Sequence, residues 1–378
     1  MGKQEGRKGR GKSPTQPVKQ MLYVSAGGRC QFPGCNKHLL LEKASWRYIN
    51  SGEVAQIVGA SENGPRGNSK SHELSQELDN LMLLCPEHHK LIDDDPDKYT
   101  VEYMSAIKEE QEKKVKFLLD GMNYPVTKFI VLESPIKGRY KTKVEKNAVI
   151  KAICSHKKRA EDQYGISIEI PAIGDYKSDL YWEFAENELK KAINTKVDVI
   201  YSDTPGLILS VFPIAPIPLI AKLGELLGDK KTVDIYQKTR IPDTWEWQSN
   251  KITNTFTTER IVLSEGKNVA IILSLTAAID LQRVTDVFEA DIIYHVKADR
   301  IEVDSIKSES DLMLFSKEVM AVCDNIKNGD NVKEVSVFPA IPVSAAFEIG
   351  RRHMPRAHPI LHIYDEDEGF FKTLSIGG

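Results

Sequence analysis

The string Ser-Val-Phe-Pro occurs twice in this chain of 378 residues, at Ser210–Pro213 and again 126 residues later at Ser336–Pro339. A proline three residues after each string and a glycine eleven residues after it recur at the same offset. An Ile-Tyr pair follows in both copies, at Ile235–Tyr236 and Ile363–Tyr364. Each copy predicts a strand, a proline-bearing turn, a helix and a second strand. Because a period this long indicates two similar domains rather than a solenoid, we predict a duplicated Rossmann-like unit in the C-terminal part.

The chain beyond residue 147 alternates runs rich in β-branched residues with amphipathic runs at helical spacing. This alternation predicts an α/β fold built in layers. The runs that predict strands are Ile166–Ile170, Val197–Tyr201, Leu207–Phe212, Val269–Leu275, Ile292–Val296 and Val335–Phe338. The runs that predict helices are Trp182–Ile193 and Leu312–Ile326. In open sheets of this class, ligands bind beyond the carboxyl ends of the strands.

Composition and charge narrow the classes of function. Lys and Arg number 51 and Asp and Glu 54, a net charge of −3, so the whole chain lacks the basic excess that wraps nucleic acid unaided. Contact with nucleic acid therefore has to come from a local patch. No run is long and apolar enough to span a bilayer, and the N-terminus lacks the apolar core of a secretory signal. We expect a cytoplasmic protein, without a membrane partner, whose cysteines are reduced.

Local composition also predicts the domain boundaries. Residues 1–20 hold six Lys and Arg against one Glu and almost nothing apolar, which predicts a basic disordered tail. Residues 21–120 contain three of the five cysteines and end in an amphipathic run, so we expect a small separate domain there. Residues 121–146 carry two prolines and several lysines without periodicity, which predicts a linker. Residues 147–378 form the duplicated unit.

Two pairs of potential metal ligands lie in the small domain. Cys30 and Cys35 flank a Pro-Gly turn, which can direct both sulfurs toward one point. Cys85 and His88 follow at knuckle spacing. Together they offer a Cys3His set, which suits a structural zinc ion. Because the segment has few large apolar clusters, binding of this metal is expected to supply much of its folding energy.

The residues from Asn80 to Asp93 read Asn-Leu-Met-Leu-Leu-Cys-Pro-Glu-His-His-Lys-Leu-Ile-Asp. This string resembles the end of the ββα-metal module of the HNH nucleases, and the resemblance covers about residues 21–120. Such enzymes hydrolyse a phosphodiester with an imidazole that takes a proton from water and a divalent cation that stabilises the phosphate charge. The resemblance implies that His89 and Asp93 hold the catalytic cation, Mg2+ or a similar ion. It implies that Asn80 orients the loop that carries the base.

The resemblance places the catalytic base about thirty residues before His89, where this chain has Val54-Ala55-Gln56-Ile57. Gln56 thus stands where the family has a histidine. A carboxamide has no basic nitrogen near neutral pH, so Gln56 cannot accept the proton of the water. We therefore expect the chain to cleave DNA poorly or not at all. Either the chain naturally carries Gln56, or a histidine has been substituted; because the rest of the motif is intact, we favour substitution.

An HNH module followed by a duplicated unit with two Val-Phe-Pro turns resembles the HNH-SAVED effectors of the bacterial CBASS antiphage systems. In that family, the SAVED domain is a fusion of two CARF-like halves that binds a cyclic oligonucleotide. Binding drives self-association, from dimer to tetramer, and activates cleavage of double-stranded DNA. The resemblance implies a cyclic dinucleotide or trinucleotide as the activator here.

A cyclic nucleotide needs flat side chains for its bases and cations or helix N-termini for its phosphates. Several residues of the C-terminal part could supply these groups, although core packing is the usual fate of a buried aromatic residue. The candidate ligand-binding residues are Lys177, Trp182, Pro213, Tyr236, Arg240, Trp247 and Pro339.

The sequence thus predicts an α/β chain with a small ββα-metal (HNH) zinc module and a duplicated Rossmann-like, CARF-like SAVED domain. We expect a DNA endonuclease effector that a cyclic nucleotide activates and that Gln56 disables. An alternative keeps the sensor, with Gln56 native and the zinc module acting as a DNA-binding or scaffolding element. A third interpretation, an enzyme that acts on nucleotides in the C-terminal part, lacks paired carboxylates or a nucleophile beside a base.

Overall fold

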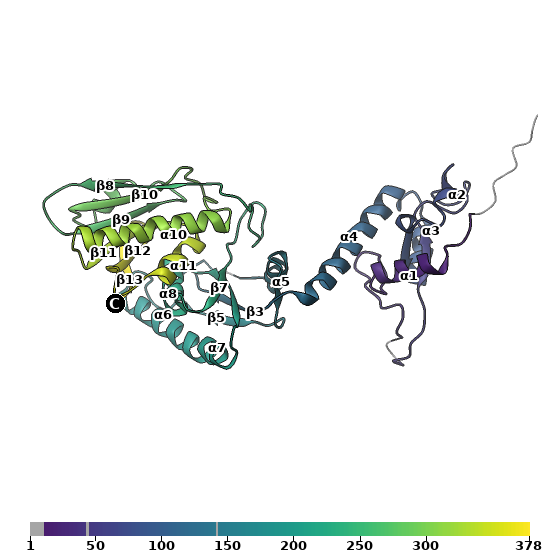
Figure 1. Ribbon diagram of the computed structural model, residues 1–378, viewed down its shortest axis with the longest axis horizontal. Coiled ribbons are helices and arrows are strands. Elements are labelled where there is room, and N and C mark those ends of the chain that lie inside the picture. The colour runs from purple at the N-terminus through teal and green to yellow at the C-terminus, as the bar shows by residue number, and fades with distance from the viewer. Residues whose placement is uncertain (1–10, 43–44, 141–142) are drawn as a thin grey trace, which may run out of the picture. The chain divides into compact units, whose positions relative to one another are not determined.

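The computed structural model describes residues 11–42, 45–140 and 143–378, and divides into two compact units (Figure 1). Unit 1 comprises Met1–Asn123 and unit 2 comprises Tyr124–Gly378. Within the described part of the chain, no helix is both long enough and apolar enough to cross a membrane.

Unit 1 is built on a ββα arrangement. Strands β1 and β2 pair antiparallel, and α3 begins two residues after β2 ends. All four residues of β2 are buried, and they belong to a core of 15 hydrophobic side chains to which α1, α3 and α4 also contribute. The elements of unit 1 are α1 (Gln16–Ser25), β1 (Glu53–Gln56), α2 (Ser71–Leu74), η1 (Leu78–Asn80), β2 (Leu81–Leu84), α3 (Pro86–Asp94), α4 (Val101–Asp120) and η2 (Gly121–Asn123).

The prediction of a disordered tail over residues 1–20 is wrong for its second half, and residues 1–10 lie outside the described residues. Helix α1 already begins at Gln16, and the Gly11 N–H donates to the carbonyl of Ala60 at 2.7 Å. This segment is helical because it has an apolar face at helical spacing, and this face packs into the core of unit 1. The burial of this face stabilises the helix despite the polar composition of the segment. This face consists of Val18, Leu22 and Ala26.

Unit 2 contains two sheets. In the first sheet all strand pairs are parallel, in the order β4-β3-β6-β7, with β5 also pairing with β3. Its strands are β3 (Val126–Glu133), β4 (Arg159–Ala160), β5 (Ile166–Glu169), β6 (Ile208–Ile214) and β7 (Thr232–Ile235). The predicted linker over 121–146 is therefore wrong where β3 lies. Most residues of β3 are buried, and a strand buried on both faces shows a continuous apolar run rather than an alternating pattern.

The second sheet has the order β13-β12-β11-β9-β10-β8. Its four inner strands pair in parallel, and the edge strands β8 and β13 pair antiparallel with their neighbours. The strands are β8 (Phe256–Val262), β9 (Val269–Ser274), β10 (Ile292–Ala298), β11 (Glu334–Ala340), β12 (Ile360–Glu366) and β13 (Phe370–Ile376).

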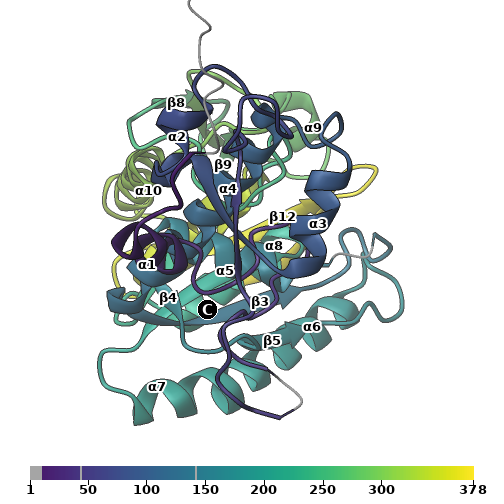
Figure 2. The ribbon, with the colours of Figure 1, turned by 90° about the vertical axis from the view of Figure 1, so that its right-hand side faces the viewer.

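The main core of unit 2 lies between the two sheets. One continuous cluster of 49 buried hydrophobic side chains includes residues of both sheets and of helices α6, α8, α10 and α11. Helices α6 and α7 continue into each other through the π-helical turn η3 as a single rod (Figure 2). The helices are α5 (Lys146–Ser155), α6 (Asp179–Ala192), η3 (Ile193–Asp198), α7 (Val199–Asp203), α8 (Ile217–Leu227), α9 (Leu281–Thr285), α10 (Glu309–Asp324), η4 (Asn325–Gly329) and α11 (Val343–Arg352).

The α/β class is confirmed, and the repeat has a direct structural counterpart. Strands β6 and β11 have the same length and are displaced by 126 residues, and α8 and α11 follow them. The two helices meet at their glycines, because a Cβ on Gly224 would lie 2.0 Å from the carbonyl oxygen of Phe347, and one on Gly350 would lie 1.8 Å from that of Ala221. Ala221 and Phe347 are themselves 126 residues apart, so the contact is symmetric in the repeat.

The predicted strand Val197–Tyr201 is wrong, because this segment belongs to the rod of α6, η3 and α7. Its β-branched residues favour a strand in isolation. Ile193 and Val197, however, are both buried in the main core, and a separation of four residues places them on the same face of a helix. Tertiary packing has therefore decided the conformation here.

Candidate functional site

Three cysteines and one histidine of unit 1 converge on one point. One ligand atom from each of Cys30, Cys35, Cys85 and His88 lies within 4.8 Å of every other. The Nδ1 atom of His88 is 3.1 Å from the sulfur of Cys85 and 3.6 Å from that of Cys30. The structure therefore brings together the two pairs that the sequence singles out, and these four side chains could hold a metal ion.

Two local features place these ligands. In the turn from Phe32 to Cys35, the Cys35 N–H donates to the Phe32 carbonyl at 3.1 Å, and Gly34 has φ = 77°, as the third residue of a type II turn requires. Cys85 is the N-cap residue of α3, so His88 follows it on the first turn of that helix. The Phe32 ring stacks on the His88 ring at a centroid separation of 4.1 Å.

The chemistry of this donor set fits zinc. Burial raises the pKa of the Cys85 thiol to about 12, and burial also raises the pKa of Cys30, because a buried thiolate is costly without a compensating charge. A bound zinc ion supplies that charge. Zn–S bonds of about 2.3 Å in a tetrahedral set place the ligand atoms roughly 4 Å apart, close to the separations found here.

His89, the next residue of α3, faces carboxylates instead of sulfur. Its Nδ1 atom lies 2.6 Å from the carboxylate of Glu53 on β1, and its Nε2 atom lies 3.6 Å from that of Asp93. His89 and Asp93, which the sequence analysis proposes as cation ligands, are thus neighbours on one face of the helix. Glu53 is a functional candidate that the sequence analysis misses. The sequence indicates it only as the single acidic residue of a four-residue strand, three residues before Gln56.

Asp93 is shared with Arg66. The Arg66 guanidinium lies 2.9 Å from the Asp93 carboxylate, and it also donates to the backbone carbonyls of Gln56, Ile57 and Ile92. Only 4% of the Arg66 side chain is exposed. A guanidinium with this many acceptors and so little exposed surface is not available to an external phosphate. Arg66 instead ties the end of β1 to the end of α3.

Gln56 and Asn80 hold the loop that follows β1. The Gln56 amide donates to the carbonyl of Ser75 at 3.0 Å, not to His89. Asn80 is buried, accepts from the Val58 N–H at 2.7 Å and donates to the Val58 carbonyl at 3.0 Å. Its side chain therefore fixes the backbone two residues beyond Gln56.

The candidate ligand residues of unit 2 are scattered. Tyr236 is fully buried in a hydrophobic cluster, so its ring is closed to a ligand and this prediction is wrong in this conformation. Trp182 is 2% exposed and lies in the main core, but it also lines a cavity of about 510 Å³, so its role stays a prediction. Pro213 is buried within β6 and Pro339 is half-buried within β11. Lys177 and Arg240 are exposed.

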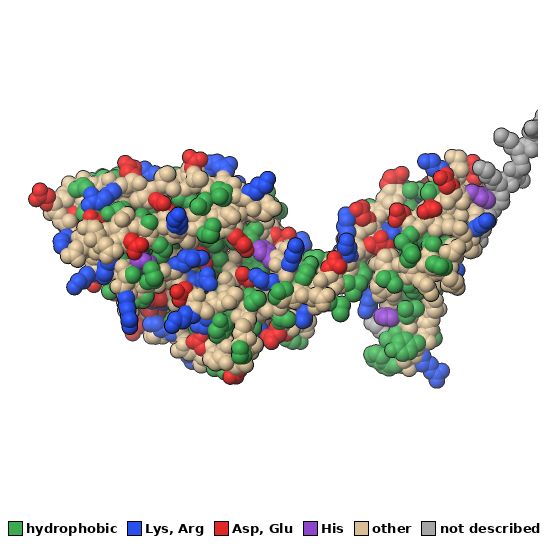
Figure 3. Space-filling model, viewed as in Figure 1, with side chains coloured by type: hydrophobic (Ala, Val, Ile, Leu, Met, Phe, Trp, Pro, Cys, Tyr) green, Lys and Arg blue, Asp and Glu red, His purple; other side chains and the backbone are tan. Residues whose placement is uncertain are grey.

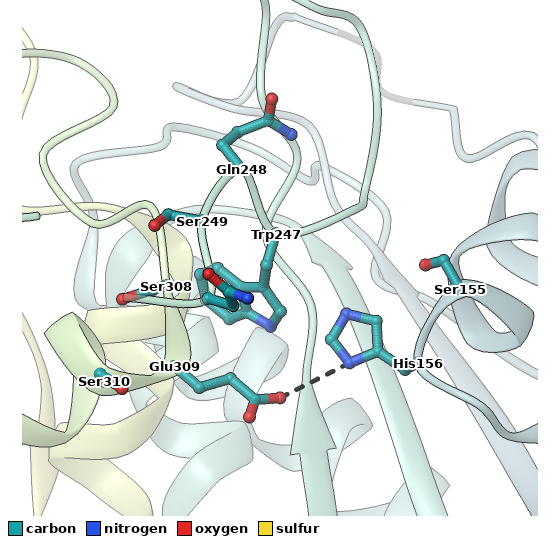
Figure 4. A pocket seen from close by; sticks show the side chains of 9 residues that line it. Ser155, His156, Trp247, Gln248, Ser249, Ser308, Glu309 and Ser310 are labelled. Atoms are coloured by element: carbon teal, nitrogen blue, oxygen red, sulfur yellow. Dashed lines mark ion pairs between the residues drawn. The ribbon is translucent and has the colours of Figure 1, made fainter. Parts of the chain in front are cut away.

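Trp247 lies in a cavity of about 580 Å³, which is within the usual range for small-molecule sites. Figure 4 shows its indole and the His156 ring on either side of this cavity, with Glu309 below them. The lining comes from the end of α5, the loop after β7 and the start of α10. Besides these three residues, the lining consists of Ser155, Gln248, Ser249, Asn250, Ser308 and Ser310.

The charges around this cavity are mixed. His156 Nδ1 lies 3.5 Å from the Glu309 carboxylate, and this interaction lowers the pKa of Glu309. At the start of α10, Ser308 and Asp311 form a capping box, so the N–H groups of these two residues already have partners. A neighbouring cavity of about 170 Å³ shares Trp247 and Glu309 and is also lined by Arg351 and Arg352. Aromatic, hydroxyl, amide and guanidinium groups are therefore within reach of one bound molecule.

This part of the chain matches a known family. Residues 188–376 match SAVED, described as "SMODS-associated and fused to various effectors sensor domain". The chain belongs to the SAVED family. The SAVED match begins within α6 and ends with β13, so it includes the whole second sheet and Trp247. No curated protein sequence matches the chain.

Solved structures of SAVED/CARF-domain receptors are also similar. The Acinetobacter baumannii Cap4 receptor with the cyclic trinucleotide 2′3′3′-cAAA has 13% identity and a TM-score of 0.43, covering 82% of this chain and 66% of that one. The same receptor with 3′3′3′-cAAA has 14% identity and a TM-score of 0.42, covering 82% and 67%. The Moraxella osloensis Cap4 receptor has 12% identity and a TM-score of 0.40, covering 76% and 60%. This chain therefore covers less than two thirds of the length of two of these receptors, 66% for the first one and 60% for the Moraxella osloensis receptor.

Proposed function

We propose that this SAVED protein is an effector of a CBASS antiphage system, in which a cyclic oligonucleotide bound by unit 2 controls a nuclease of the HNH type in unit 1. One observation carries the proposal. A SAVED sensor shares its chain with a unit whose helix α3 directs His88 toward three thiols and His89 toward two carboxylates. Adjacent histidines with these surroundings suit a structural metal and a catalytic metal side by side.

The residues of unit 1 would have separate roles in such a nuclease. Cys30, Cys35, Cys85 and His88 would hold a structural zinc ion. His89, with Glu53 and Asp93, would hold a divalent cation such as Mg2+, which when bound stabilises the charge that develops on the phosphate. Asn80 fixes the backbone at Val58, and this keeps the residue at position 56 in place relative to α3.

Gln56 leaves this site without a base. Its amide nitrogen is not basic, and its amide already donates to Ser75, so no group at this position takes a proton from water. General bases commonly contribute factors of about 10² to 10⁴ in rate. The chain as it stands is therefore inactive or severely impaired as a double-stranded DNA endonuclease.

The cavity at Trp247 is the ligand site that the geometry of unit 2 supports best. The indole can stack on a base, and the surrounding serine, glutamine and asparagine side chains can read base edges. Arg352, rather than Lys177 or Arg240, borders this region, and its 47% exposed side chain can meet a phosphate beside its ion pair with Glu348. Arg351 borders it too, but it is 15% exposed and bonds to Glu348 and to the Lys231 carbonyl. We expect a cyclic dinucleotide or trinucleotide here, and we expect binding to drive self-association from dimer to tetramer in the cytoplasm.

A second candidate function keeps the sensor but makes unit 1 a DNA-binding or scaffolding module. The contact from the Gln56 amide to Ser75 favours it, because a native structural glutamine would have just such a partner. The Gln56→His variant separates the two functions. Our proposal predicts that this variant, supplied with Mg2+ and a panel of cyclic dinucleotides and trinucleotides including 3′3′3′-cAAA, cuts plasmid DNA.

Two further results decide this experiment. Adding His89→Ala to the Gln56→His variant should abolish the cutting, because the cation then loses a ligand. A Gln56→His variant that retains its zinc and stays inert with every activator would exclude the nuclease and leave the scaffolding function.

A further inference from the structure

Unit 1 carries a projecting surface of large side chains, formed by Leu40, Trp46, Arg47, Tyr48 and Ile49 and called here the Trp46 surface. All five residues are exposed. Tyr48 is 89% exposed and Trp46 75% exposed, more than any other aromatic side chain in the described part of the chain. Figure 3 shows hydrophobic side chains gathered at this tip of unit 1, with basic side chains beside them.

The Trp46 surface stands on a fixed base. Leu39, which is fully buried, donates its N–H to Gly28 at 2.9 Å and accepts from the Ser51 N–H at 2.8 Å. The Tyr23 hydroxyl donates to the Asn50 side chain at 2.7 Å. Both ends of the projecting segment are thus bonded to the body of unit 1, so burial of its aromatic tip against a partner would need little further ordering of the base.

The backbone at the tip is strained. Trp46 has φ = 54°, a left-handed conformation that is unfavourable for a bulky side chain. Strain of this kind persists where the surroundings or a function maintain it. Trp46 lies in the turn that the Glu42–Arg47 bridge closes, and its exposed ring contributes nothing to the core of unit 1. This large exposed ring is therefore available for binding.

The segment that forms this surface has an excess of basic residues. The sequence from Arg29 to Asn50, which contains the Trp46 surface, carries four Lys and Arg against one acidic residue, Glu42. Arg47 forms no ion pair with an acidic residue among those that the structure describes. The Trp46 surface therefore lies in a segment with a local basic excess, and a polyanion is the partner that matches it.

The Trp46 surface also begins next to the candidate cleavage site. Asn50 accepts from the Gly52 N–H at 3.0 Å, and the following residue is Glu53, whose carboxylate contacts His89. Only three residues, Asn50 to Gly52, separate the end of the Trp46 surface from Glu53 along the chain. The surface is therefore placed to touch the same nucleic acid.

We propose that the Trp46 surface docks on duplex DNA, with Trp46 and Tyr48 acting as a wedge against the bases and Arg47 contacting the phosphate backbone. Apolar and aromatic wedges of this kind enter the minor groove and partly unstack a base step, and aromatic contacts with bases are worth factors of about 5 to 150 in affinity. The inference rests on the proposed function, because it assumes that unit 1 meets DNA.

The test uses the full chain, which does not cut, and a fluorescein-labelled 20-base-pair duplex. Affinity is measured by anisotropy at several salt concentrations. The double variant Trp46→Ala/Tyr48→Ala should weaken binding at least tenfold with an unchanged salt slope, whereas Trp46→Phe should retain most of the affinity. Arg47→Gln should lower the salt slope by about one, since it removes one phosphate contact. Tyr164→Ala, at a 66% exposed tyrosine of unit 2, is the matched control and should have no effect.

Tryptophan emission provides a second readout. Of the four tryptophans, Trp182 and Trp245 are each 2% exposed and Trp247 is half-buried, so acrylamide quenching reports mainly on Trp46. Added duplex should protect Trp46 from the quencher, and the zinc content of each variant should equal that of the parent.

Four outcomes overturn the proposal. The double variant binds as tightly as the parent; Tyr164→Ala weakens binding equally; Trp46 is protected by a higher protein concentration alone; or Trp46 is protected by anionic vesicles and not by DNA. If the parent binds no duplex and Gln56→His does not cut, the proposed function fails as well. If the parent binds and Gln56→His cuts while the double variant is unaffected, only the wedge fails.

Discussion

Unit 1 and unit 2 are stabilised in different ways. Unit 2 places 49 buried hydrophobic side chains in one cluster between two sheets, and further clusters cover the outer faces of both sheets. Unit 1 has a single cluster of 15, and two of these are the metal-ligand candidates Cys30 and Cys85. A small core supplies little surplus over the entropy of ordering the chain, and small domains commonly add a metal for this reason. The comparison predicts that unit 1 needs a bound metal ion for stability, whereas unit 2 is stabilised by its own apolar core.

The largest effect that tests this difference is loss of the metal. We expect Cys85→Ser, or chelation of the wild-type chain, to unfold unit 1 and leave unit 2 folded, because structural zinc contributes on the order of 10 kcal/mol in small domains. Hydrogen exchange resolved by peptide would report the two units separately. The matched control is Cys154→Ser in unit 2, where no metal cluster is found among the described residues. A Cys85→Ser chain with fully protected β2 would contradict the account.

A second substitution tests the helix contact of unit 2. In Gly350→Ala the new Cβ would lie 1.8 Å from the Ala221 carbonyl oxygen, so α8 and α11 must separate. We expect unit 2 to lose roughly 3 kcal/mol or more of its free energy of unfolding, with zinc content unchanged. Gly329→Ala is the control, because a Cβ at this position would have no other atom within 4 Å and the φ of Gly329 is not left-handed. Equal melting temperatures for the two variants would show that the contact is not tight.

The dependence of stability on pH should also distinguish the units. Burial lowers the pKa of His295 to about 4, and burial also lowers the pKa values of His353 and His358. Below pH 6.5 the unfolded chain binds protons that the folded unit 2 does not, so the free energy of unfolding falls as the pH falls from 6.5 toward 4. For His295 alone the loss is up to about 3 kcal/mol.

His295→Asn, which can keep the contact with Ser274, should flatten this slope in denaturant titrations monitored by tryptophan emission. The control is His38→Asn in unit 1, which should leave the slope of unit 2 unchanged. A slope that is the same in the His295→Asn chain and the parent would contradict the assignment.

The sequence predicts those features that depend on local spacing. The repeat anticipated β6, α8, β11 and α11 because strand, turn and helix patterns are local. The Cys3His set was predicted because the two residues of each pair are close in sequence, so a local turn is enough to bring their side chains together. Glu53 was missed because its contact with His89 joins residues 36 positions apart. Val197–Tyr201 was wrongly assigned because burial against the core outweighed its strand preference.

The same distinction explains the ligand residues. An aromatic residue that serves as core cannot be told from one that stacks on a ligand until its neighbours are known. Tyr236 is fully buried, whereas Trp247 is half-buried and lines a cavity with residues from three separate segments of unit 2. Its place there depends on the loop after β7, for which the sequence shows no periodic pattern.

The most direct measurement of the whole account is the rate at which the Gln56→His chain cuts duplex DNA with Mg2+, in the presence and absence of a cyclic oligonucleotide that binds the parent chain. We predict cutting only when the nucleotide is present, and we predict that Trp247→Ala removes this activation while unit 1 keeps its zinc. Cutting at the same rate without the nucleotide, or no cutting in any condition, would contradict the claim that unit 2 controls a nuclease in unit 1.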